Sequence, residues 1–352
     1  MIKRKETIKL RIGNIEVGGG APISVQSMTN TDTRDVEATV RQIKELQEHG
    51  CEIIRLAVLN SDAADKLKEI KKKVEIPMIA DIHFDYRLAI QAIENGIDAL
   101  RLNPGNIGKR ENVEKVVKLA KINSTPIRIG VNAGSLQKDI AETDLPLSDK
   151  LVLSAQRHIK ILEDLDFNLI KISLKSSSVL TTIEAYRKMS EAVNYPLHVG
   201  VTESGTLKNG SVKSAVGIGT LLAEGIGDTI RVSLTENPVE EVDMGYEILK
   251  SLELRQRGIN FISCPTCGRT QIDLIKLAKE VQERFKNCDK NLTIAVMGCA
   301  VNGPGEAKHA DYGIAGGIGE GYIFKKGEIL LKVKEDELLD TFEKLIKTEE
   351  KI

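Results

Sequence analysis

The segment from Glu52 to Asn103, EIIRLAVLNSDAADKLKEIKKKVEIPMIADIHFDYRLAIQAIENGIDALRLN, decides the fold class of this protein. It holds three short runs rich in aliphatic residues, and two longer stretches with the periodicity of an amphipathic helix separate them. A strand, a helix and a second strand in succession are typical of a parallel sheet, because parallel neighbours need a crossover connection. The segment therefore predicts consecutive strand–helix units.

The same alternation continues on both sides, after a short hairpin signal at residues 8–17. Eight β-rich segments are expected, at residues 23–28, 52–58, 77–82, 99–103, 126–131, 169–174, 196–202 and 229–234. Helical patterns follow at 36–49, 62–73, 87–95, 110–123, 148–165, 179–193, 211–224 and 239–252. Eight such units in about 250 residues predict an α/β fold with a (β/α)₈ TIM-type barrel over residues 1–254, and an open doubly wound sheet is the alternative.

Five of the expected strands carry one cation between aliphatic neighbours. The triplets are Ile54-Arg55-Leu56, Leu100-Arg101-Leu102, Ile127-Arg128-Ile129, Ile170-Lys171-Ile172 and Ile230-Arg231-Val232. Barrel strands face the lumen and the helices alternately, so each cation enters a dry environment and needs an anion. Internal ion pairs with Asp81, Glu203 or Glu236 are one solution. For the whole set, we favour a phosphate or diphosphate ligand held by several lumenal arginines.

Polar loops with glycine or hydroxyl residues follow four of the eight expected strands, at the carboxyl ends where barrel active sites lie. They are residues 103–106, 132–135, 202–205 and 233–236. Glycine lets backbone N–H groups approach an anion, and amide and hydroxyl side chains add donors. Lys175 and Glu203 are the candidate acid–base residues. Asp81 and His83 could ligate a metal, although hydrogen bonding to a ligand or neighbour is the favoured interpretation.

The composition excludes several classes of partner. The chain has 352 residues with 50 Lys and Arg against 51 Asp and Glu, whereas general nucleic-acid binders usually show a basic excess. Aromatic residues amount to 3% and Trp is absent, which disfavours base stacking. No segment approaches the ~18 apolar residues of a membrane span, and the charged start does not resemble a signal peptide. We therefore expect a cytoplasmic protein without membrane or nucleic-acid partners.

Residues 255–352 are expected to form a small α+β domain with a metal centre. Cys264 and Cys267 form a Cys-x-x-Cys motif before an expected helix at 271–285, and Cys299 follows an expected strand at 292–297. Three thiolates on two glycine-containing loops indicate a metal site.

Two kinds of metal fit these cysteines. Cys288 or His309 could complete a tetrahedral zinc site. Iron would take the form of a [4Fe–4S] cluster whose fourth iron needs another ligand, and Glu306 is the nearest candidate. The spacing slightly favours iron. Cys51 is expected to be a buried core residue, and the glycine-rich residues 313–321 are expected to form turns.

The motifs resemble one family over nearly the whole chain. Cys264-Pro265-Thr266-Cys267-Gly268-Arg269 and Met297-Gly298-Cys299-Ala300-Val301-Asn302-Gly303-Pro304-Gly305-Glu306 look like the bacterial 4-hydroxy-3-methylbut-2-enyl diphosphate synthase family (IspG, also called GcpE) in its two-domain form. Segments 25–29, 102–106, 130–136, 200–205 and 230–234 match the family in the same order.

This resemblance implies an oxidoreductase of the non-mevalonate (MEP) pathway of isoprenoid biosynthesis. It would reductively open 2-C-methyl-D-erythritol 2,4-cyclodiphosphate to (E)-4-hydroxy-3-methylbut-2-enyl diphosphate, with electrons from ferredoxin or flavodoxin passing through a [4Fe–4S] cluster. The implied cluster ligands are Cys264, Cys267, Cys299 and Glu306, and the implied catalytic residues are Glu203 and Glu306. The implied substrate-binding residues are Arg55, Arg101, Asn103, Arg128, Asn132, Lys175, Arg231 and Ser233. Lys171 has no counterpart in this set.

Chain length adds an expectation about assembly. The last barrel helix should return the chain to the end opposite the active-site mouth, and the connector to Cys264 has about ten residues, a reach of at most ~35 Å. We therefore expect a head-to-tail homodimer in which each cluster domain caps the partner's barrel, as the family's two-domain form also suggests. Two other functions remain open at this point: a phosphate-ligand binding protein stabilised by zinc, and a metal-dependent barrel hydrolase that uses Asp81 and His83.

Overall fold

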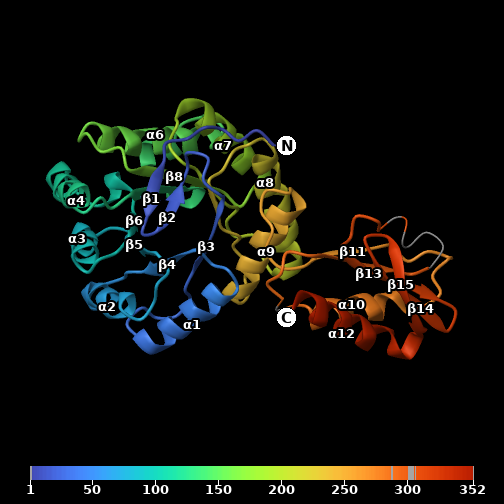
Figure 1. Cartoon of the computed structure of the whole chain (residues 1–352). Helices are drawn as coiled ribbons and strands as arrows, with labels where there is room; N and C mark the ends of the chain where they lie inside the picture. The colour runs from blue at the N-terminus through green and yellow to red at the C-terminus, as the bar shows by residue number, and fades with distance from the viewer. Residues whose placement is uncertain (1, 287, 300–304, 306, 352) are drawn as a thin grey trace. The chain divides into compact units, whose positions relative to one another are not determined.

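The computed structural model describes residues 2–286, 288–299, 305 and 307–351 (Figure 1). The chain divides into two compact units, Met1–Arg255 and Gln256–Ile352. The boundary lies one residue beyond the expected position after residue 254, because the Arg255 guanidinium donates to the Ile23 carbonyl at 2.8 Å and pairs with Glu52 at 2.6 Å. These contacts hold the end of the first unit against its own strands.

The first unit is the predicted barrel of eight parallel strands. They are β3 (Ser24–Met28), β4 (Ile53–Ala57), β5 (Met78–Asp81), β6 (Ala99–Arg101), β7 (Ile127–Asn132), β8 (Ile170–Lys175), β9 (His198–Val199) and β10 (Thr229–Ile230). The sheet order is β8-β7-β6-β5-β4-β3-β10-β9, and an isolated bridge between Ile172 and Leu197 joins its two ends. The prediction of a barrel is confirmed, and the open sheet is excluded.

Helices surround the barrel (Figure 1). They are α1 (Val36–Glu48), α2 (Ser61–Lys71), α3 (Tyr86–Glu94), α4 (Arg110–Ile122), α5 (Lys138–Ala141), α6 (Leu147–Glu163), α7 (Val179–Ala192), α8 (Leu207–Ala223) and α9 (Pro238–Ser251). Side chains of Asp35, Asn60 and Ser178 accept N–H hydrogen bonds at the starts of α1, α2 and α7, which satisfies otherwise unpaired donors. α8 starts at Leu207, four residues before the expected position 211. The additional first turn includes Gly210, where a Cβ would lie 2.4 Å from the Leu234 side chain. Glycine is tolerated there because it allows this close approach.

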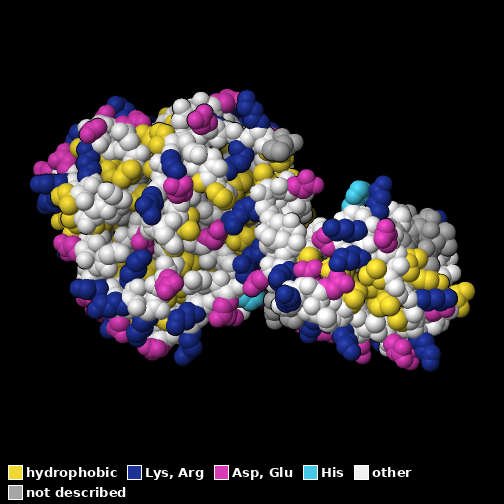
Figure 2. All heavy atoms as spheres, viewed as in Figure 1, with side chains coloured by type: hydrophobic (Ala, Val, Ile, Leu, Met, Phe, Trp, Pro, Cys, Tyr) yellow, Lys and Arg dark blue, Asp and Glu magenta, His cyan; other side chains and the backbone are white. Residues whose placement is uncertain are grey.

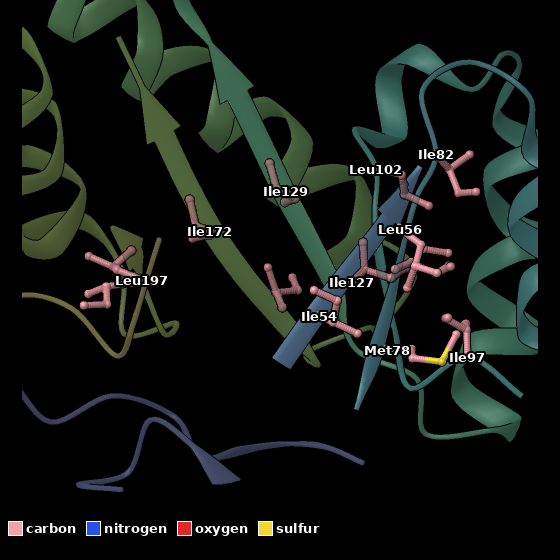
Figure 3. Packing of buried hydrophobic residues seen from close by; sticks show 14 of the residues in the cluster. Ile54, Leu56, Met78, Ile82, Ile97, Leu102, Ile127, Ile129, Ile172 and Leu197 are labelled. Atoms are coloured by element: carbon pink, nitrogen blue, oxygen red, sulfur yellow. The ribbon is translucent and has the colours of Figure 1, made fainter. Parts of the chain in front are cut away.

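The aliphatic residues that flank each strand cation face the helices. Figure 3 shows Ile54, Leu56, Ile127 and Ile129 among the buried hydrophobic residues of the strand–helix core. Because side chains alternate along a strand, the residue between two such neighbours points into the lumen. The apolar pattern therefore fixes the direction of the cations.

The amino-terminal end of the barrel is closed by a hairpin. Strands β1 (Leu10–Ile12) and β2 (Ile15–Val17) pair antiparallel around Gly13, whose φ of 56° suits glycine. Their apolar side chains pack against Ile53, Ile79 and Ala99. Polar lumenal groups are thereby covered from this end.

The second unit has a five-stranded sheet in the order β11-β12-β13-β14-β15. Its elements are β11 (Asn260–Ser263), α10 (Leu274–Arg284), β12 (Thr293–Met297), β13 (Tyr312–Gly317), β14 (Glu320–Lys325), β15 (Glu328–Lys334) and α12 (Leu338–Glu350). β11, β12 and β13 are parallel, and the last two strands are antiparallel additions.

The glycine-rich residues 313–321 form strands as well as a turn, which corrects the expectation of turns alone. Added Cβ atoms would lie 2.1 Å from Phe324 at Gly313 and 2.5 Å from Ile272 at Gly316. These glycines lie in β13, where large neighbouring side chains cross close above the backbone.

The surface carries both signs of charge. Figure 2 shows Lys and Arg interspersed with Asp and Glu over the visible face of each unit. In the described part of the chain, none of the helices combines the length and apolar character needed to cross a membrane.

Candidate active site

A cavity of about 190 Å³ lies at the carboxyl ends of the barrel strands. Its lining is almost entirely polar: Arg55, Asp81, His83, Arg101, Arg128, Asn132, Ser173, Lys175, Thr202, Arg231 and Ser233. Of the expected substrate-binding residues, the barrel brings together Arg55, Arg101, Arg128, Asn132, Lys175, Arg231 and Ser233. The remaining one, Asn103, is not part of this lining.

Asp81 neutralises one side of the cavity. Its carboxylate accepts a hydrogen bond from Arg101 Nη1 at 3.2 Å and lies 3.7 Å from Arg55 Nε. Burial raises the pKa of Asp81, but Arg55, the His83 hydrogen bond and Arg101 outweigh it, so the pKa lies well below its usual range. Asp81 is therefore ionised and engaged with cations, which agrees with the favoured interpretation of hydrogen bonding.

Glu241, on α9, neutralises the other side. It is 4% exposed, and its Oε2 accepts from Arg231 Nη2 at 3.1 Å and from Arg231 Nε at 3.2 Å. Glu203 and Glu236, which were alternative internal partners for the strand cations, are both exposed, and Glu241 pairs with Arg231 instead. The Met28 sulfur lies 2.9 Å from Arg55 Nη2 and 3.7 Å from Arg231 Nη1, which places a soft acceptor between two cations.

Arg128 and Lys175 have no carboxylate partner among the described residues. Arg128 is 2% exposed and donates from Nη1 to Ser173 Oγ at 2.7 Å, while its Nε and Nη2 have no partner in the described part of the chain. Burial, followed by neighbouring cations, lowers the pKa of both groups well below their ordinary values. An anion entering the cavity would remove this electrostatic penalty.

Lys171 lies deeper in the lumen. It pairs in register with Arg128 between β7 and β8, is 1% exposed, and its Nζ has no hydrogen-bond partner among the described residues. Six described cations thus surround the lumen, with Asp81 and Glu241 as the carboxylates paired with them at the cavity and Asp228 acting on Lys171: Arg55, Arg101, Arg128, Lys171, Lys175 and Arg231. The site is built for an anion.

Asn103 connects two strands instead of facing the cavity. Its amide donates to the Gly130 carbonyl at 3.0 Å and accepts from the Gly130 N–H at 2.9 Å. Both polar atoms are therefore occupied by β7 backbone. Asn132, at the end of the same strand, does line the cavity.

Glu203 follows the cavity residue Thr202 and is exposed. Its φ of 52° places a non-glycine residue in the left-handed region, which costs free energy. Such strained backbone conformations are frequent at functional sites. Here the left-handed conformation of Glu203 changes the direction of the chain directly after Thr202, which lines the cavity.

The sequence did not single out Ser173, Met28 or Glu241, and it included Thr202 only as part of the polar loop at 202–205. Ser173 could have been found from period two, since it lies between Lys171 and Lys175 on one face of β8. Glu241 is one acidic residue on the otherwise apolar face of α9, and this pattern does not reveal its partner.

The cysteine loops follow two paired parallel strands of the second unit. The register places Ser263 opposite Val296, so Cys264 lies beside the Gly298-Cys299 turn. Cys264 Sγ accepts from the Gly298 N–H at 3.2 Å, and the Gly298 carbonyl accepts from the Gln271 N–H at 2.9 Å. The structure therefore brings the two cysteine loops together.

The donor set fits a soft metal centre. Hydrogen bonds from the backbone and then the side chain of Arg269 lower the pKa of Cys267, which favours a thiolate. No group of three metal-binding side chains is gathered among the residues described, and Glu306 lies outside them. The fit therefore rests on Cys264, Cys267 and Cys299, which two hydrogen-bonded loops carry.

Cys288 lies away from these loops. A Cβ on Gly258, which precedes β11, would lie 3.1 Å from the Cys288 carbonyl, whereas Cys264 follows the other end of that strand. At about 3.3 Å per residue, six residues of nearly extended chain separate the two ends by up to ~20 Å. Cys288 is thus poorly placed to complete a zinc site with Cys264. Cys51, in the barrel, is 3% exposed, and burial raises the pKa of its thiol to about 12, as expected for a core residue.

The two units match two models of one family. The GcpE TIM-barrel domain matches residues 7–246, and the GcpE protein C-terminal domain matches residues 260–348. A cation-lined barrel followed by a cysteine-bearing unit thus defines the class of protein. The chain belongs to the GcpE family.

Relatives of known name are similar along their whole length. The 4-hydroxy-3-methylbut-2-en-1-yl diphosphate synthase (flavodoxin) of Clostridium perfringens is 64% identical over 348 residues, which are 99% of this chain and 100% of that protein. The protein of the same name from Clostridium acetobutylicum is 60% identical over 340 residues, 96% of this chain and 97% of that protein. The predicted family and an oxidoreductase of the non-mevalonate pathway are confirmed.

The comparisons do not support the two other functions, a zinc-stabilised binding protein and a barrel hydrolase. Membership of the family agrees with an iron–sulfur cofactor on the cysteine loops.

Solved structures share the barrel fold alone. The dihydropteroate synthase of Coxiella burnetii has a TM-score of 0.52 and 14% identity, covering 70% of this chain and 98% of that chain. That of Xanthomonas albilineans with 4-aminobenzoic acid has a TM-score of 0.51 and 11% identity, covering 70% and 97%.

Proposed function

We propose that this chain reductively opens 2-C-methyl-D-erythritol 2,4-cyclodiphosphate to (E)-4-hydroxy-3-methylbut-2-enyl diphosphate, using the lumenal cavity as the substrate site. The observation that carries the assignment of the site is the excess of buried cations over carboxylates around the cavity. A cyclic diphosphate supplies the missing negative charge, and it is small enough to be surrounded by side chains of several strands.

The cations differ in their freedom to bind this substrate. Asp81 already pairs with Arg101 and Arg55, and Glu241 pairs with Arg231. These three arginines are therefore oriented before the substrate binds. Arg128 and Lys175 lack such partners among the described residues, and they would make the strongest new contacts with phosphate oxygens. The same groups would stabilise the charge that develops on the phosphate oxygen released by ring opening.

Cys264, Cys267 and Cys299, with Glu306 as the fourth ligand, would hold a [4Fe–4S] cluster, which supplies two electrons one at a time when bound. Glu306 is proposed by resemblance alone. A Glu306→Cys variant should retain iron but lose turnover, because a fourth thiolate is harder to displace than a carboxylate. Turnover equal to that of the wild type would remove Glu306 from the mechanism.

Glu203 is proposed as the proton donor. Its side chain is exposed and can exchange protons with water. It directly follows the cavity residue Thr202, and its left-handed backbone conformation makes the chain turn at this point. Flavodoxin is proposed as the electron carrier, because the names of the relatives from both Clostridium species include it.

A head-to-tail homodimer is proposed as the active assembly, on the argument from connector length. Mixing Glu203→Ala with Cys299→Ala subunits should restore part of the activity, since a heterodimer would contain one intact pair of sites. No recovery after proven subunit exchange would contradict this assembly.

The central experiment is anaerobic purification followed by iron and sulfide quantification and a turnover assay with reduced flavodoxin and the cyclic diphosphate. We expect about four irons per chain and formation of the linear diphosphate. An iron-free protein, or an iron-loaded protein without turnover, would contradict the proposal.

A further inference from the structure

His158, on α6, joins two loops that follow neighbouring barrel strands. It is 2% exposed and does not line the cavity. Its Nδ1 accepts a hydrogen bond from the Gly105 N–H at 3.1 Å, and its Nε2 lies 3.0 Å from the side-chain amide of Gln137. Gly105 belongs to the short helix η1 (Pro104–Asn106) after β6, and Gln137 follows the short helix η2 (Ala133–Ser135) after β7.

The hydrogen bonds define the protonation of this imidazole. Nδ1 must be unprotonated to accept from a backbone N–H, so a neutral ring carries its hydrogen on Nε2 and donates it. In the structure Ser154 Oγ donates to Gln137 Oε1 at 2.7 Å and Gln137 Nε2 faces His158 Nε2. This tautomer of His158 requires the Gln137 amide in the opposite orientation, with Oε1 facing His158 Nε2 and the amide nitrogen donating to Ser154 Oγ. Burial lowers the pKa of His158 to about 4, which keeps the ring neutral near pH 7.

Packing makes the connection rigid. A Cβ on Gly105 would lie 2.9 Å from His158 Cε1, so the ring lies directly against the backbone of η1. Two residues before Gly105, Asn103 holds the Gly130 backbone of β7 through both atoms of its amide. The imidazole thus continues a chain of contacts between the β6 loop and the β7 loop, which ends at the cavity residue Asn132.

We infer that His158 is a positioning residue, which holds the β6 and β7 loops in the arrangement that presents Asn132 and the neighbouring arginines to a phosphorylated ligand. It acts through these loops and does not contact the ligand. The identity of the substrate rests on the proposed function, whereas the positioning role concerns any diphosphate in the cavity. Loosening two loops at the rim should weaken ligand binding more than it slows the reaction.

Three variants of the full-length holoprotein separate the contacts. His158→Phe fills the volume but removes both hydrogen bonds. His158→Asn places Oδ1 near the position of Nδ1 and restores an acceptor for Gly105. Gln137→Leu removes the other contact, and His158→Phe combined with Gln137→Leu completes a double-mutant cycle. Thermal unfolding of each variant establishes that the barrel is folded at the assay temperature.

Binding is measured by calorimetry with the cyclic diphosphate and separately with inorganic pyrophosphate, and KM and kcat are measured in parallel. His158→Phe should raise Kd for both ligands and KM by about tenfold to a hundredfold, with kcat changed by less than about threefold. His158→Asn should recover most of the lost affinity, and the effects of His158→Phe and Gln137→Leu should be less than additive.

Kd values of folded His158→Phe within about twofold of the wild type would overturn the inference, as would failure of His158→Asn to recover affinity. If the wild type binds pyrophosphate but not the cyclic diphosphate, the proposed substrate is wrong, and the pyrophosphate series still decides the role of His158. If the wild type binds neither ligand, both proposals are wrong.

Discussion

Arg231 and Glu241 form a buried ion pair in which Arg231 Nη2 and Nε donate to Glu241 Oε2 at 3.1 and 3.2 Å. Glu241 Oε1 also accepts from the Leu234 N–H at 3.0 Å, so the carboxylate holds both the cation and the loop after β10. Arg231 lines the cavity from this position. The pair therefore couples the stability of the barrel to the geometry of its anion site.

Glu241→Gln should lower the free energy of unfolding by about 2–4 kcal/mol, because it leaves a largely buried guanidinium without its counter-charge. Urea unfolding measures this change. Glu236→Gln is the matched control, since Glu236 is exposed, and its effect should stay within about 0.5 kcal/mol. Equal changes in the free energy of unfolding for the two substitutions would show that the Arg231–Glu241 pair does not stabilise the protein.

Arg128→Met and Arg101→Met should have opposite effects on stability. Arg128 has no carboxylate partner among the described residues, so its removal should leave the free energy of unfolding unchanged or higher. Arg101 pairs with Asp81, and its removal should cost about 2–4 kcal/mol. Both should weaken pyrophosphate binding at least about tenfold by calorimetry. Arg128→Met with full affinity would contradict its assignment to the anion site.

Lys171→Met should stabilise the protein by about 1–4 kcal/mol, since it replaces by an apolar chain a buried amine that has no hydrogen-bond partner among the described residues and that Asp228 stabilises less than burial and Arg128 destabilise it. Burial, then Arg128, lowers the pKa of Lys171, so the unfolded state binds more protons between the folded and unfolded pKa values. The free energy of unfolding of the wild type should therefore rise with pH between these two pKa values. The Lys171→Met variant should lack this part of the pH dependence. Lys160→Met, on the surface of α6, is the control, and a destabilised Lys171→Met protein would contradict the prediction.

The buried His158 should make stability depend on pH in the acid range. Its pKa falls from 6.5 to about 4 on folding, so the unfolded state binds the extra proton first as pH falls. The resulting stabilisation is complete above pH 6.5 and is lost on acidification towards pH 4, with a total of up to about 3 kcal/mol. The difference in urea unfolding between wild type and His158→Asn should shrink over this interval. A difference that does not vary with pH would mean that His158 is not buried as a neutral ring.

Cysteine substitutions should separate cluster ligands from bystanders. Cys299→Ser should lose most of the iron after anaerobic purification, because it follows the Gly298 turn that holds Cys264. Cys288→Ser should retain about the wild-type content of four irons per chain, since Cys288 lies by the opposite end of β11. Loss of iron in Cys288→Ser would return Cys288 to the ligand set.

Local pattern was sufficient for the architecture. The eight strands and the eight long helices of the barrel agree with the prediction to within about four residues at each end, because apolar periodicity records which face each element buries, whereas the short helix α5 was not predicted. The same pattern directed Arg55, Arg101, Arg128 and Arg231 into the lumen, because each lies between two helix-facing aliphatic residues. Motif resemblance identified the family and the cysteines.

The sequence by itself thus determined the barrel, the direction of its cations and the family to which the chain belongs, since these depend on local periodicity and contiguous motifs. Only the tertiary structure decided that Glu241, not Glu203 or Glu236, neutralises Arg231, and that Asn103 binds backbone instead of facing the cavity. It alone placed His158 beneath two loops. Such partnerships depend on how barrel closure and helix packing bring distant residues within hydrogen-bond distance, and neither periodicity nor spacing along the chain encodes that distance.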